Sequence, residues 1–354
     1  MPAIHQFTAG FTPGDAISNE AKLFRDIFRS WGYTSEIFSE ESCIRKSTHH
    51  NVVDVDHCLT TADDIVLLHL SIGSKVNESF KALKCKKVIL YHNITPSHYF
   101  TLVNKQTESN LKRGRKQVAG LSKTADINLA VSKFNASELT ELGYQNVEVL
   151  PLVLDFSMLT EKIDLRLSRK LQDGKKNILF VGRCTPNKKI EDLLQVFAYY
   201  QKTIESNSRL IHVGSHAGSE HYYNILTGIV HELNINNVMF TGSILQPELN
   251  ACYANSDAFL CMSEHEGFCI PLIESMIHEL PILAHASAAI PETLDESGIL
   301  IRERDYDLAA ELLNQIISNH KLRTAVINQQ SERLARYNSR DLRSELKNHL
   351  ASLL

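Results

Sequence analysis

Short apolar segments alternate with helical patterns from one end of the chain to the other. The segment 17–31, between the first two apolar segments, places Ile17, Phe24 and Trp31 on one stripe of a helix. Strands that are apolar at every position are typical of parallel sheets with helices on both faces, so we predict an α/β protein. The predicted strands are 4–7, 65–70, 88–92, 127–131 and 147–150 in the first half, and 178–182, 210–214, 238–242, 258–263, 282–286 and 299–301 in the second half.

One charged segment, residues 157–176, interrupts this alternation and ends in Asp-Gly-Lys-Lys before a new strand. The chain has 354 residues, which suits two domains better than one. We predict a Rossmann-like domain over 1–156, a linker over 157–176 and a second Rossmann-like domain over 177–336. Residues 337–354 are expected to form a C-terminal helix, and packing of this helix against the first domain is one arrangement open to it. Doubly wound parallel sheets bind ligands at the carboxyl ends of their strands, so we expect the two domains to face a central cleft.

Composition excludes several classes of protein. The formal net charge of -4 gives no reason to expect a nucleic-acid partner. No stretch of the sequence approaches 18 uncharged apolar residues, and the first residues do not resemble a signal peptide. The thiols show neither a Cys-x-x-Cys pair nor a metal-ligand spacing with histidine, so we expect reduced, buried cysteines in a cytoplasmic protein. The seven cysteines stand at 43, 58, 85, 184, 252, 261 and 269.

The strongest motif is the segment 263–274, with the sequence Ser-Glu-His-Glu-Gly-Phe-Cys-Ile-Pro-Leu-Ile-Glu. It predicts a strand that ends at Ser263, a glycine-containing loop and a helix that starts at Pro271, and the first N–H groups of such a helix bind anions. We expect Glu266 in the loop and Glu274 about one turn into the helix. Carboxylates there suit the hydroxyl groups of a sugar and a ribose. Taken alone, the glutamates could equally cap or solvate the helix.

A second loop follows the strand predicted at 178–182. It reads Gly182-Arg183-Cys-Thr-Pro-Asn-Lys188-Lys and precedes another helical pattern. We expect Arg183 to bind a diphosphate through planar bidentate contacts and Lys188 to neutralise it as a point charge. A single basic loop of this kind is usually a solvated turn, so the interpretation depends on the two motifs occurring together.

Together the two segments resemble glycosyltransferase family four, a family of retaining enzymes with the GT-B fold. Its marks are a Glu-x7-Glu element, here Glu266 to Glu274, and a Gly-Arg…Lys loop, here Gly182 to Lys188. The resemblance covers the whole C-terminal domain. It implies that Glu266 contacts the donor hexose, that Glu274 contacts the ribose hydroxyls, and that the basic pair binds the diphosphate. The same resemblance implies further donor contacts, near the sugar and phosphate or near the base, from Gly267, Phe268, Cys269, Ile270, Ser243 and Ile244.

The N-terminal half resembles the family less closely. Relatives carry a glycine pair near the donor phosphates where this chain has Gly14 and Asp15. Because a diphosphate repels a carboxylate, we expect Asp15 to meet a hydroxyl group or to cap the helix. His92 ends a predicted strand where the family often has a sugar-contacting histidine, and we assign it a catalytic role. A satisfied, half-buried histidine is the alternative, and His69 has the same setting with a weaker claim.

One pattern favours a different, metal-dependent glycosyltransferase. Asp54-Val55-Asp56 matches an Asp-x-Asp element, but Asp305-Tyr306-Asp307 matches it too. Such short matches arise by chance. We therefore predict no metal site and no cofactor, with metal binding at Asp54 and Asp56 as the alternative.

The segment 105–123 is strongly basic. It contains a single acidic residue, Glu108, and further lysines precede it in the same predicted domain. Such a surface is attracted to anionic lipid or to a diphosphate-linked acceptor, although a solvated helix face is the simpler explanation. The basic residues are Lys105, Lys112, Arg113, Arg115, Lys116 and Lys123, preceded by Lys81, Lys84, Lys86 and Lys87.

These expectations combine into one functional hypothesis. The resemblance implies a metal-independent, retaining hexosyltransferase whose second domain binds a nucleotide sugar and whose first domain binds a glycan or lipid-linked acceptor. Similarity to bacterial enzymes of surface-polysaccharide assembly favours GDP-mannose as the donor, with UDP-hexoses open. We expect a cytoplasmic location with possible attachment to the inner face of the membrane. The alternatives are a GT-B sugar-nucleotide epimerase or phosphorylase, and a catalytically silent nucleotide-sugar-binding protein.

Overall fold

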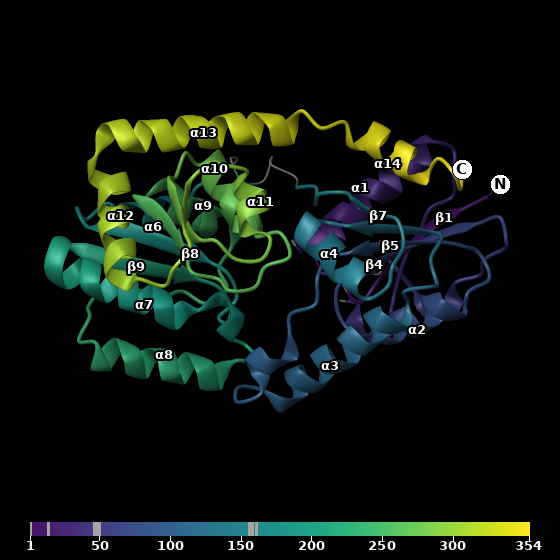
Figure 1. Ribbon diagram of the computed structural model, residues 1–354, viewed down its shortest axis with the longest axis horizontal. Coiled ribbons are helices and arrows are strands. Elements are labelled where there is room, and N and C mark those ends of the chain that lie inside the picture. Colours follow the sequence, from purple (N-terminus) through teal and green to yellow (C-terminus); the bar gives the residue numbers. More distant parts are fainter. Residues whose placement is uncertain (1, 13–14, 45–50, 155–158, 160–161) are drawn as a thin grey trace. The chain divides into compact units, whose positions relative to one another are not determined.

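The computed structural model describes residues 2–12, 15–44, 51–154, 159 and 162–354 (Figure 1). Its internal contacts divide the chain into two compact units, and both contain more than one segment. The first unit consists of Met1–His98, Gln106–Asp155 and Arg340–Leu354. The second unit consists of Tyr99–Lys105 and Phe156–Ser339.

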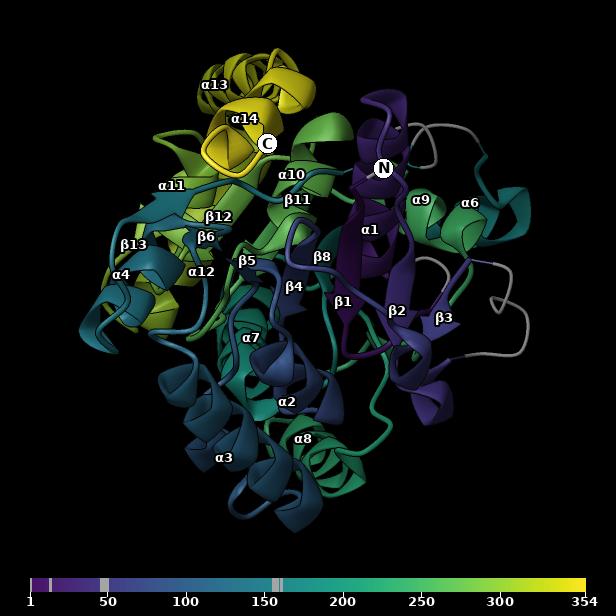
Figure 2. The same ribbon diagram turned by 90° about the vertical axis from the view of Figure 1, so that its right-hand side faces the viewer.

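A seven-stranded parallel sheet forms the core of the first unit. Its strand order is β3-β2-β1-β4-β5-β6-β7, and Figure 2 shows β6 to β3 in this succession. Both central strands, β1 and β4, are buried at every position, as expected when helices cover both faces of a sheet. The strands are β1 (Ile4–Thr8), β2 (Ile37–Ser39), β3 (Val53–Asp54), β4 (Ile65–Leu70), β5 (Lys86–Tyr91), β6 (Ile127–Ala130) and β7 (Val147–Val149).

Helix α1 illustrates how the first unit is assembled. It buries Ala21, Phe24 and Phe28 on one stripe, and Oδ2 of Asp15 accepts a hydrogen bond from the backbone N–H of Ser18 at 3.0 Å. The cap satisfies one of the free N–H groups at the start of the helix. The helices are α1 (Ala16–Ser30), α2 (Lys75–Ala82), α3 (Lys105–Gly120), α4 (Lys133–Glu141) and α14 (Leu342–Leu350), with short 3-10 turns at Glu41–Cys43, Val55–His57 and Ser97–Phe100.

The last residues of the chain belong to the first unit. Nη1 of Arg340 donates to the backbone oxygen of Pro151 at 3.0 Å, and Nδ1 of His349 lies 2.5 Å from Oε2 of Glu148. These contacts attach α14 to the strand β7 and the segment that follows it.

The second unit contains a six-stranded parallel sheet with the order β10-β9-β8-β11-β12-β13. Its strands are β8 (Lys176–Val181), β9 (Ser208–Val213), β10 (Val238–Phe240), β11 (Ala258–Cys261), β12 (Ile282–His285) and β13 (Ile299–Ile301). Its helices are α6 (Leu165–Leu171), α7 (Ile190–Tyr199), α8 (Glu220–Glu232), α9 (Gln246–Ala254), α10 (Ile270–Ile277), α11 (Ile290–Leu294), α12 (Tyr306–Ser318) and α13 (His320–Asn338), with a 3-10 turn at Pro186–Lys188 and a π-helical turn at Tyr200–Ile204.

The predicted α/β class with two doubly wound parallel sheets is confirmed. All eleven predicted strands are present, but β2 and β3 were not predicted, because segments of three and two residues are too short to show a pattern. Part of the predicted linker, Leu165–Leu171, forms helix α6, which packs against α9. The seven cysteines are free, but Cys43 is exposed and Cys58 and Cys85 are partly exposed, which corrects the expectation of buried thiols at these positions. Within the described residues, no helix combines the length and the apolar character that a bilayer crossing requires.

Candidate active site

The two motif loops of the second unit leave neighbouring strands. From β8 the chain proceeds through β9 and β10 on one side of the sheet, and from β11 it proceeds through β12 and β13 on the other side. The carboxyl ends of β8 and β11 therefore mark the point where the strand order reverses, and doubly wound sheets bind ligands at such a point. The loop 182–189 follows β8 and the loop 262–269 follows β11.

Backbone contacts hold these two loops together. The backbone oxygen of Asn187 accepts from the N–H of Glu264 at 2.8 Å, and its side-chain Nδ2 donates to the backbone oxygen of His265 at 3.1 Å. Gly214, after β9, lies so close to Gly182 that a Cβ atom on Gly214 would lie 1.8 Å from the Gly182 oxygen. Only glycine fits there, so the close approach of the two loops is built into the sequence.

Lys188 and Glu266 meet within this site. Nζ of Lys188 lies 2.6 Å from both carboxylate oxygens of Glu266, and the two side chains are 19% and 9% exposed. Burial alone would lower the pKa of Lys188, but the Glu266 carboxylate raises it above its usual value. Lys188 is therefore a fixed positive charge at neutral pH.

Arg183 lies in the exposed part of the same loop. Among the described residues, no side chain pairs with its guanidinium. An unpaired arginine beside a neutralised Lys188–Glu266 pair leaves the loop with a net positive charge, and this charge is available to an anion.

The backbone before α10 offers hydrogen-bond donors. The N–H groups of Phe268, Cys269 and Ile270 donate to no other group in the described part of the chain. Cys269 adopts the left-handed conformation with φ of 69° and is followed by the helix, an alternation that directs successive N–H groups to one side. The helix starts at Ile270, one residue earlier than predicted, and proline occupies its second position. Three free N–H groups at a helix start form an anion site.

Glu274 lies in the second turn of α10 and has a different partner. Its Oε2 accepts a hydrogen bond from Oη of Tyr253 at 2.6 Å, and the Tyr253 ring stacks on His278. Burial raises the pKa of Glu274, and the tyrosine hydroxyl partly offsets this rise. Tyr253 was not predicted, because nothing in the sequence relates α9 to α10.

The loop after β10 contains the remaining predicted donor contacts. The N–H of Gly214 donates to the oxygen of Gly242 at 3.1 Å, which places this loop beside the loop after β9. Ser243 is exposed and Ile244 is partly exposed. Gly267 is partly exposed in the loop before α10. The structure thus gathers the predicted residues of the second unit at the carboxyl edge of its sheet.

Sequence reasoning missed a further cluster in this unit. Nη2 of Arg304 lies 3.0 Å from Oε1 of Glu264, and Nζ of Lys189 lies 4.0 Å from Oε2 of the same carboxylate. Burial and the neighbouring Glu264 carboxylate raise the pKa of Tyr99 to about 12. Glu264 stands two residues before Glu266, so its place in the motif was a signal that could have identified it.

In the first unit, His92 directly follows β5 and is only 4% exposed. Its Nε2 lies 3.1 Å from Nδ1 of His69, and 3.6 Å from Oε2 of Glu20 on α1. Burial lowers the pKa of His92 to about 3.

Asp15 caps α1, in agreement with the expected cap, and the predicted contact Gly14 lies outside the described residues. Glu20 was not predicted, although a charged residue on the apolar stripe of a helix was a visible signal.

The Asp-x-Asp element has ordinary structural roles. Oδ1 of Asp54 accepts from the N–H of Asp56 at 3.2 Å, and Oδ2 of Asp56 pairs with Nζ of Lys75 at 2.7 Å. Within the described residues, two other groups bring three potential ligand atoms within 4.8 Å of one another. These groups are Glu20–His69–His92 and Cys261–Glu266–Cys269.

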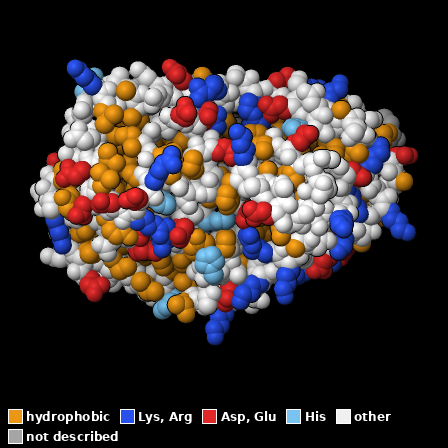
Figure 3. Space-filling view, viewed as in Figure 1, with side chains coloured by type: hydrophobic (Ala, Val, Ile, Leu, Met, Phe, Trp, Pro, Cys, Tyr) orange, Lys and Arg blue, Asp and Glu red, His pale blue; other side chains and the backbone are white. Residues whose placement is uncertain are grey.

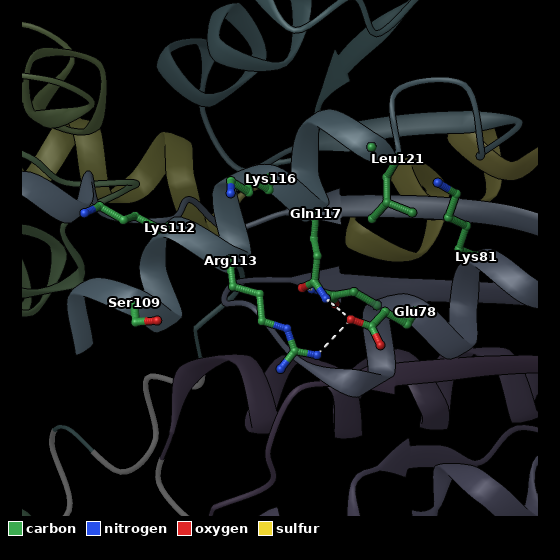
Figure 4. A pocket seen from close by; sticks show the side chains of 10 residues that line it. Glu78, Lys81, Ser109, Lys112, Arg113, Lys116, Gln117 and Leu121 are labelled. Carbon is green, nitrogen blue, oxygen red and sulfur yellow. Dashed lines mark hydrogen bonds and ion pairs between the residues drawn. The ribbon is translucent and has the colours of Figure 1, made fainter. Parts of the chain in front are cut away.

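The basic segment 105–123 includes helix α3, and Figure 3 shows Lys and Arg side chains along the lower edge, where Figure 1 places this helix. Arg113 pairs with Glu78 at 2.8 Å and Arg115 pairs with Glu138 at 3.0 Å, which reduces the free positive charge. A cavity of about 550 Å³ lies between α2 and α3. In Figure 4, Arg113 and Gln117 point toward Glu78, whereas Lys112 points away from it.

Known proteins resemble this chain in sequence and in fold. A family model described as glycosyl transferases group 1 matches residues 161–333. An uncharacterized 41.2 kDa protein in the cps region of Klebsiella pneumoniae is 24% identical over 266 residues, which cover 71% of this chain and 68% of that protein. The O-antigen chain mannosyltransferase B of Escherichia coli is 23% identical over 240 residues, 65% of this chain and 61% of that protein.

A structural likeness extends over the whole chain. The crystal structure of Anabaena HepE in complex with UDP-glucose matches with a TM-score of 0.74 at 17% identity, over 99% of both chains. The likeness shows the fold, two Rossmann-like parallel sheets of the GT-B type. Residues 161–333, which contain both motif loops, are similar to the glycosyl transferases group 1 family.

Proposed function

We propose that this protein is a glycosyltransferase that takes a hexose from a nucleotide sugar and transfers it with retention to a glycan or lipid-linked acceptor in cell-surface polysaccharide biosynthesis. The observation that carries the proposal is the anion site of the second unit. At one strand-order reversal it combines the unpaired guanidinium of Arg183, the ammonium of Lys188 and the free N–H groups of Phe268, Cys269 and Ile270. This set suits a nucleoside diphosphate.

The same groups account for the chemistry without a metal. As the bond from the anomeric carbon to the donor phosphate breaks, negative charge accumulates on the leaving diphosphate and the sugar becomes similar to an oxocarbenium ion. Arg183, Lys188 and the N–H groups before α10 stabilise that charge where it develops. The leaving phosphate then accepts the proton of the acceptor hydroxyl, which attacks from the same face, so the anomeric configuration is retained.

Glu266 orients the donor sugar in this scheme. Its carboxylate is already held by Lys188, so it accepts hydrogen bonds from sugar hydroxyls from a fixed position. Glu274, fixed by Tyr253, accepts from the ribose hydroxyls. Ser243 and Ile244 lie along the neighbouring loop and contact the base. His92 in the first unit contacts a sugar hydroxyl.

GDP-mannose is the favoured donor. Support comes from the E. coli relative, which is named an O-antigen chain mannosyltransferase. HepE was crystallised with UDP-glucose, so a UDP-hexose is the competing donor. The cps region named for the Klebsiella relative agrees with a role in surface polysaccharide assembly.

The basic helix α3 supports peripheral contact with an anionic membrane. Lys81 and Lys116 line the cavity between α2 and α3 and form no ion pair with Glu78, whereas Lys112 pairs with Glu108 at 2.6 Å (Figure 4). Anionic lipid attracts such lysines by about 1 kcal/mol each. A lipid-linked acceptor would be reached from this surface.

Labelled GDP-mannose and UDP-glucose, offered with a panel of polyprenyl-diphosphate-linked glycans in EDTA, test the proposal. We expect transfer from one donor, an α-linked product by NMR, and loss of transfer in Arg183→Ala. The control Arg169→Ala removes an exposed arginine from α6 and should transfer normally. Conversion of the nucleotide sugar without an acceptor would instead establish an epimerase, and strict dependence on added Mg²⁺ or Mn²⁺ would overturn the metal-independent scheme.

A further inference from the structure

A buried polar cluster lies at the strand-order reversal of the first unit, where β1 and β4 are neighbours. It consists of Glu20 on α1, His69 in β4 and His92 after β5. The side chains are 0%, 0% and 4% exposed. Buried ionisable groups are costly unless they are paired, so a cluster of three requires a reason.

A directional chain of hydrogen bonds runs through the cluster. Nε2 of Gln6 donates to the backbone oxygen of Ala21 at 2.9 Å, which turns its Oε1 toward Nε2 of His69, also at 2.9 Å. Because Oε1 can only accept, Nε2 of His69 carries the proton. Burial lowers the pKa of His69, so the ring is neutral and its Nδ1 is an acceptor.

The chain continues from His69 to His92. Nε2 of His92 lies 3.1 Å from Nδ1 of His69, and since that atom accepts, Nε2 of His92 donates. A neutral imidazole with a proton on Nε2 has a lone pair on Nδ1. Among the described residues, Nδ1 of His92 has no partner, so this lone pair is free for a ligand.

Glu20 completes the cluster. Its Oε1 accepts from the N–H of Val153 at 3.0 Å, while Oε2 has no hydrogen-bond partner in the described part of the chain. Oε2 lies 3.7 Å from Nδ1 of His69 and 3.6 Å from Nε2 of His92. A carboxylate there would compete for the Nε2 proton of His92, whereas a neutral carboxyl group would not.

We propose that Gln6, His69 and Glu20 are positioning residues, which hold His92 with its Nε2 proton directed inward and its Nδ1 lone pair presented to a substrate hydroxyl. The inference rests on the proposed transfer function. It requires the carboxyl group of Glu20 to be protonated, and therefore neutral, in the active enzyme. Burial, offset by the Val153 N–H and by the charge of Arg340, raises the pKa of Glu20 to about 8, which agrees with this assignment.

Two variants of His69 separate positioning from structure. Asparagine can place an oxygen near the position of Nδ1 and so accept from His92, whereas leucine cannot. We expect His69→Asn to keep most of the turnover, and His69→Leu to lose about a hundred-fold in kcat with an unchanged nucleotide Kd. Equal turnover in two folded variants would overturn the proposal.

A ¹⁵N-histidine NMR spectrum reads the tautomer directly, with the His92→Gln variant to identify the signals of His92. The proposal requires the Nε2-protonated form in the wild type and in His69→Asn, and its loss in His69→Leu. An Nδ1-protonated His92 in the wild type would overturn the proposal whether or not the protein transfers sugar. A correct tautomer in a wild type that transfers no sugar would overturn the proposed function and, with it, the role in transfer.

The pH profile tests Glu20. Above about pH 8 the carboxyl group of Glu20 ionises and competes for the proton on Nε2 of His92, so kcat should fall in the wild type. In Glu20→Gln, kcat should stay level to pH 9. The charged and titratable groups that face Glu20 are His69, His92 and Arg340. An identical fall in both proteins would contradict the role of Glu20.

Metal analysis addresses the competing explanation of the cluster. Three ligand atoms 3.1, 3.6 and 3.7 Å apart also match the spacing around a tetrahedral metal ion. Purified protein should contain no stoichiometric metal and show no binding of Zn²⁺ that depends on His69. One equivalent of zinc, lost in His69→Leu, would overturn the positioning proposal in favour of a metal site.

Discussion

Nζ of Lys188 lies 2.6 Å from both carboxylate oxygens of Glu266, although the two residues are 78 positions apart in the sequence. The pair joins the loop after β8 to the loop after β11, and it is mostly shielded from solvent. It therefore fixes, relative to each other, the two groups that we propose bind the donor phosphate and the donor sugar.

Removing one member of this pair should leave the other uncompensated. We expect Lys188→Met and Glu266→Gln each to lower the free energy of unfolding by about 1–3 kcal/mol, and the double variant to lose clearly less than the sum. Urea denaturation of the four proteins measures this coupling. Strict additivity would show that the contact contributes nothing in solution.

A substitution of Arg183 should lower activity without lowering stability, unlike the substitutions of Lys188 and Glu266. The side chain of Arg183 is exposed and unpaired among the described residues, so Arg183→Ala should leave the urea midpoint of unfolding unchanged. The same change should lower kcat/KM by about a hundred-fold, because one preorganised donor to the leaving diphosphate is lost. Steady-state kinetics at fixed donor, beside Arg169→Ala, gives the comparison; normal kinetics in Arg183→Ala would remove this residue from the site.

Gly214 should tolerate no side chain. A Cβ atom there would lie 1.8 Å from the Gly182 oxygen, so Gly214→Ala must displace the loop that carries Arg183. We expect a lower melting temperature and weaker nucleotide binding, both followed by thermal unfolding with and without nucleotide. Gly228→Ala is the matched control, because nothing lies within 4 Å of its added Cβ and alanine favours the interior of α8. Equal behaviour of the two variants would contradict the close approach.

Glu20 should make stability depend on pH. Its pKa is about 8 in the folded protein and 4.5 without burial, so between these values the folded state holds a proton that the unfolded state has lost. This group therefore lowers stability as pH rises from 4.5 to 8. Glu20→Gln removes the dependence, and we expect its advantage in melting temperature over the wild type to grow between pH 6 and pH 8. A constant difference across this range would show that Glu20 is already ionised.

The sequence predicted the parts of the fold that have strong patterns. Strands β4 and β11, which lie near the centres of the two sheets, are apolar at nearly every position, so they could be located from the sequence. Strands β2 and β3 were not, because the pairing of β2 with β1 and of β3 with β2 depends on sheet register and not on local pattern. Lys188 and Glu266 could be assigned to one site from two motifs, since loops after neighbouring parallel strands meet at one edge.

The polar partners of the predicted residues could not be predicted from the sequence and became visible only in the structure. Tyr253 reaches Glu274 from another helix, and Glu20 reaches His92 from α1 through a buried interior. Such contacts depend on how helices pack, and a single sequence contains little of that information. The left-handed backbone conformation of Cys269 was likewise not predictable, because the short turn before α10 imposes it.

Nucleotide binding tests the central claim most directly. Isothermal titration of the wild type and Arg183→Ala with GDP-mannose, UDP-glucose, GDP, UDP and ADP in EDTA should show one preferred base in the wild type. The affinity for that nucleotide should fall at least ten-fold in Arg183→Ala. No binding of any nucleotide by the wild type, or equal affinity in the two proteins, would contradict a donor site built on the loops after β8 and β11.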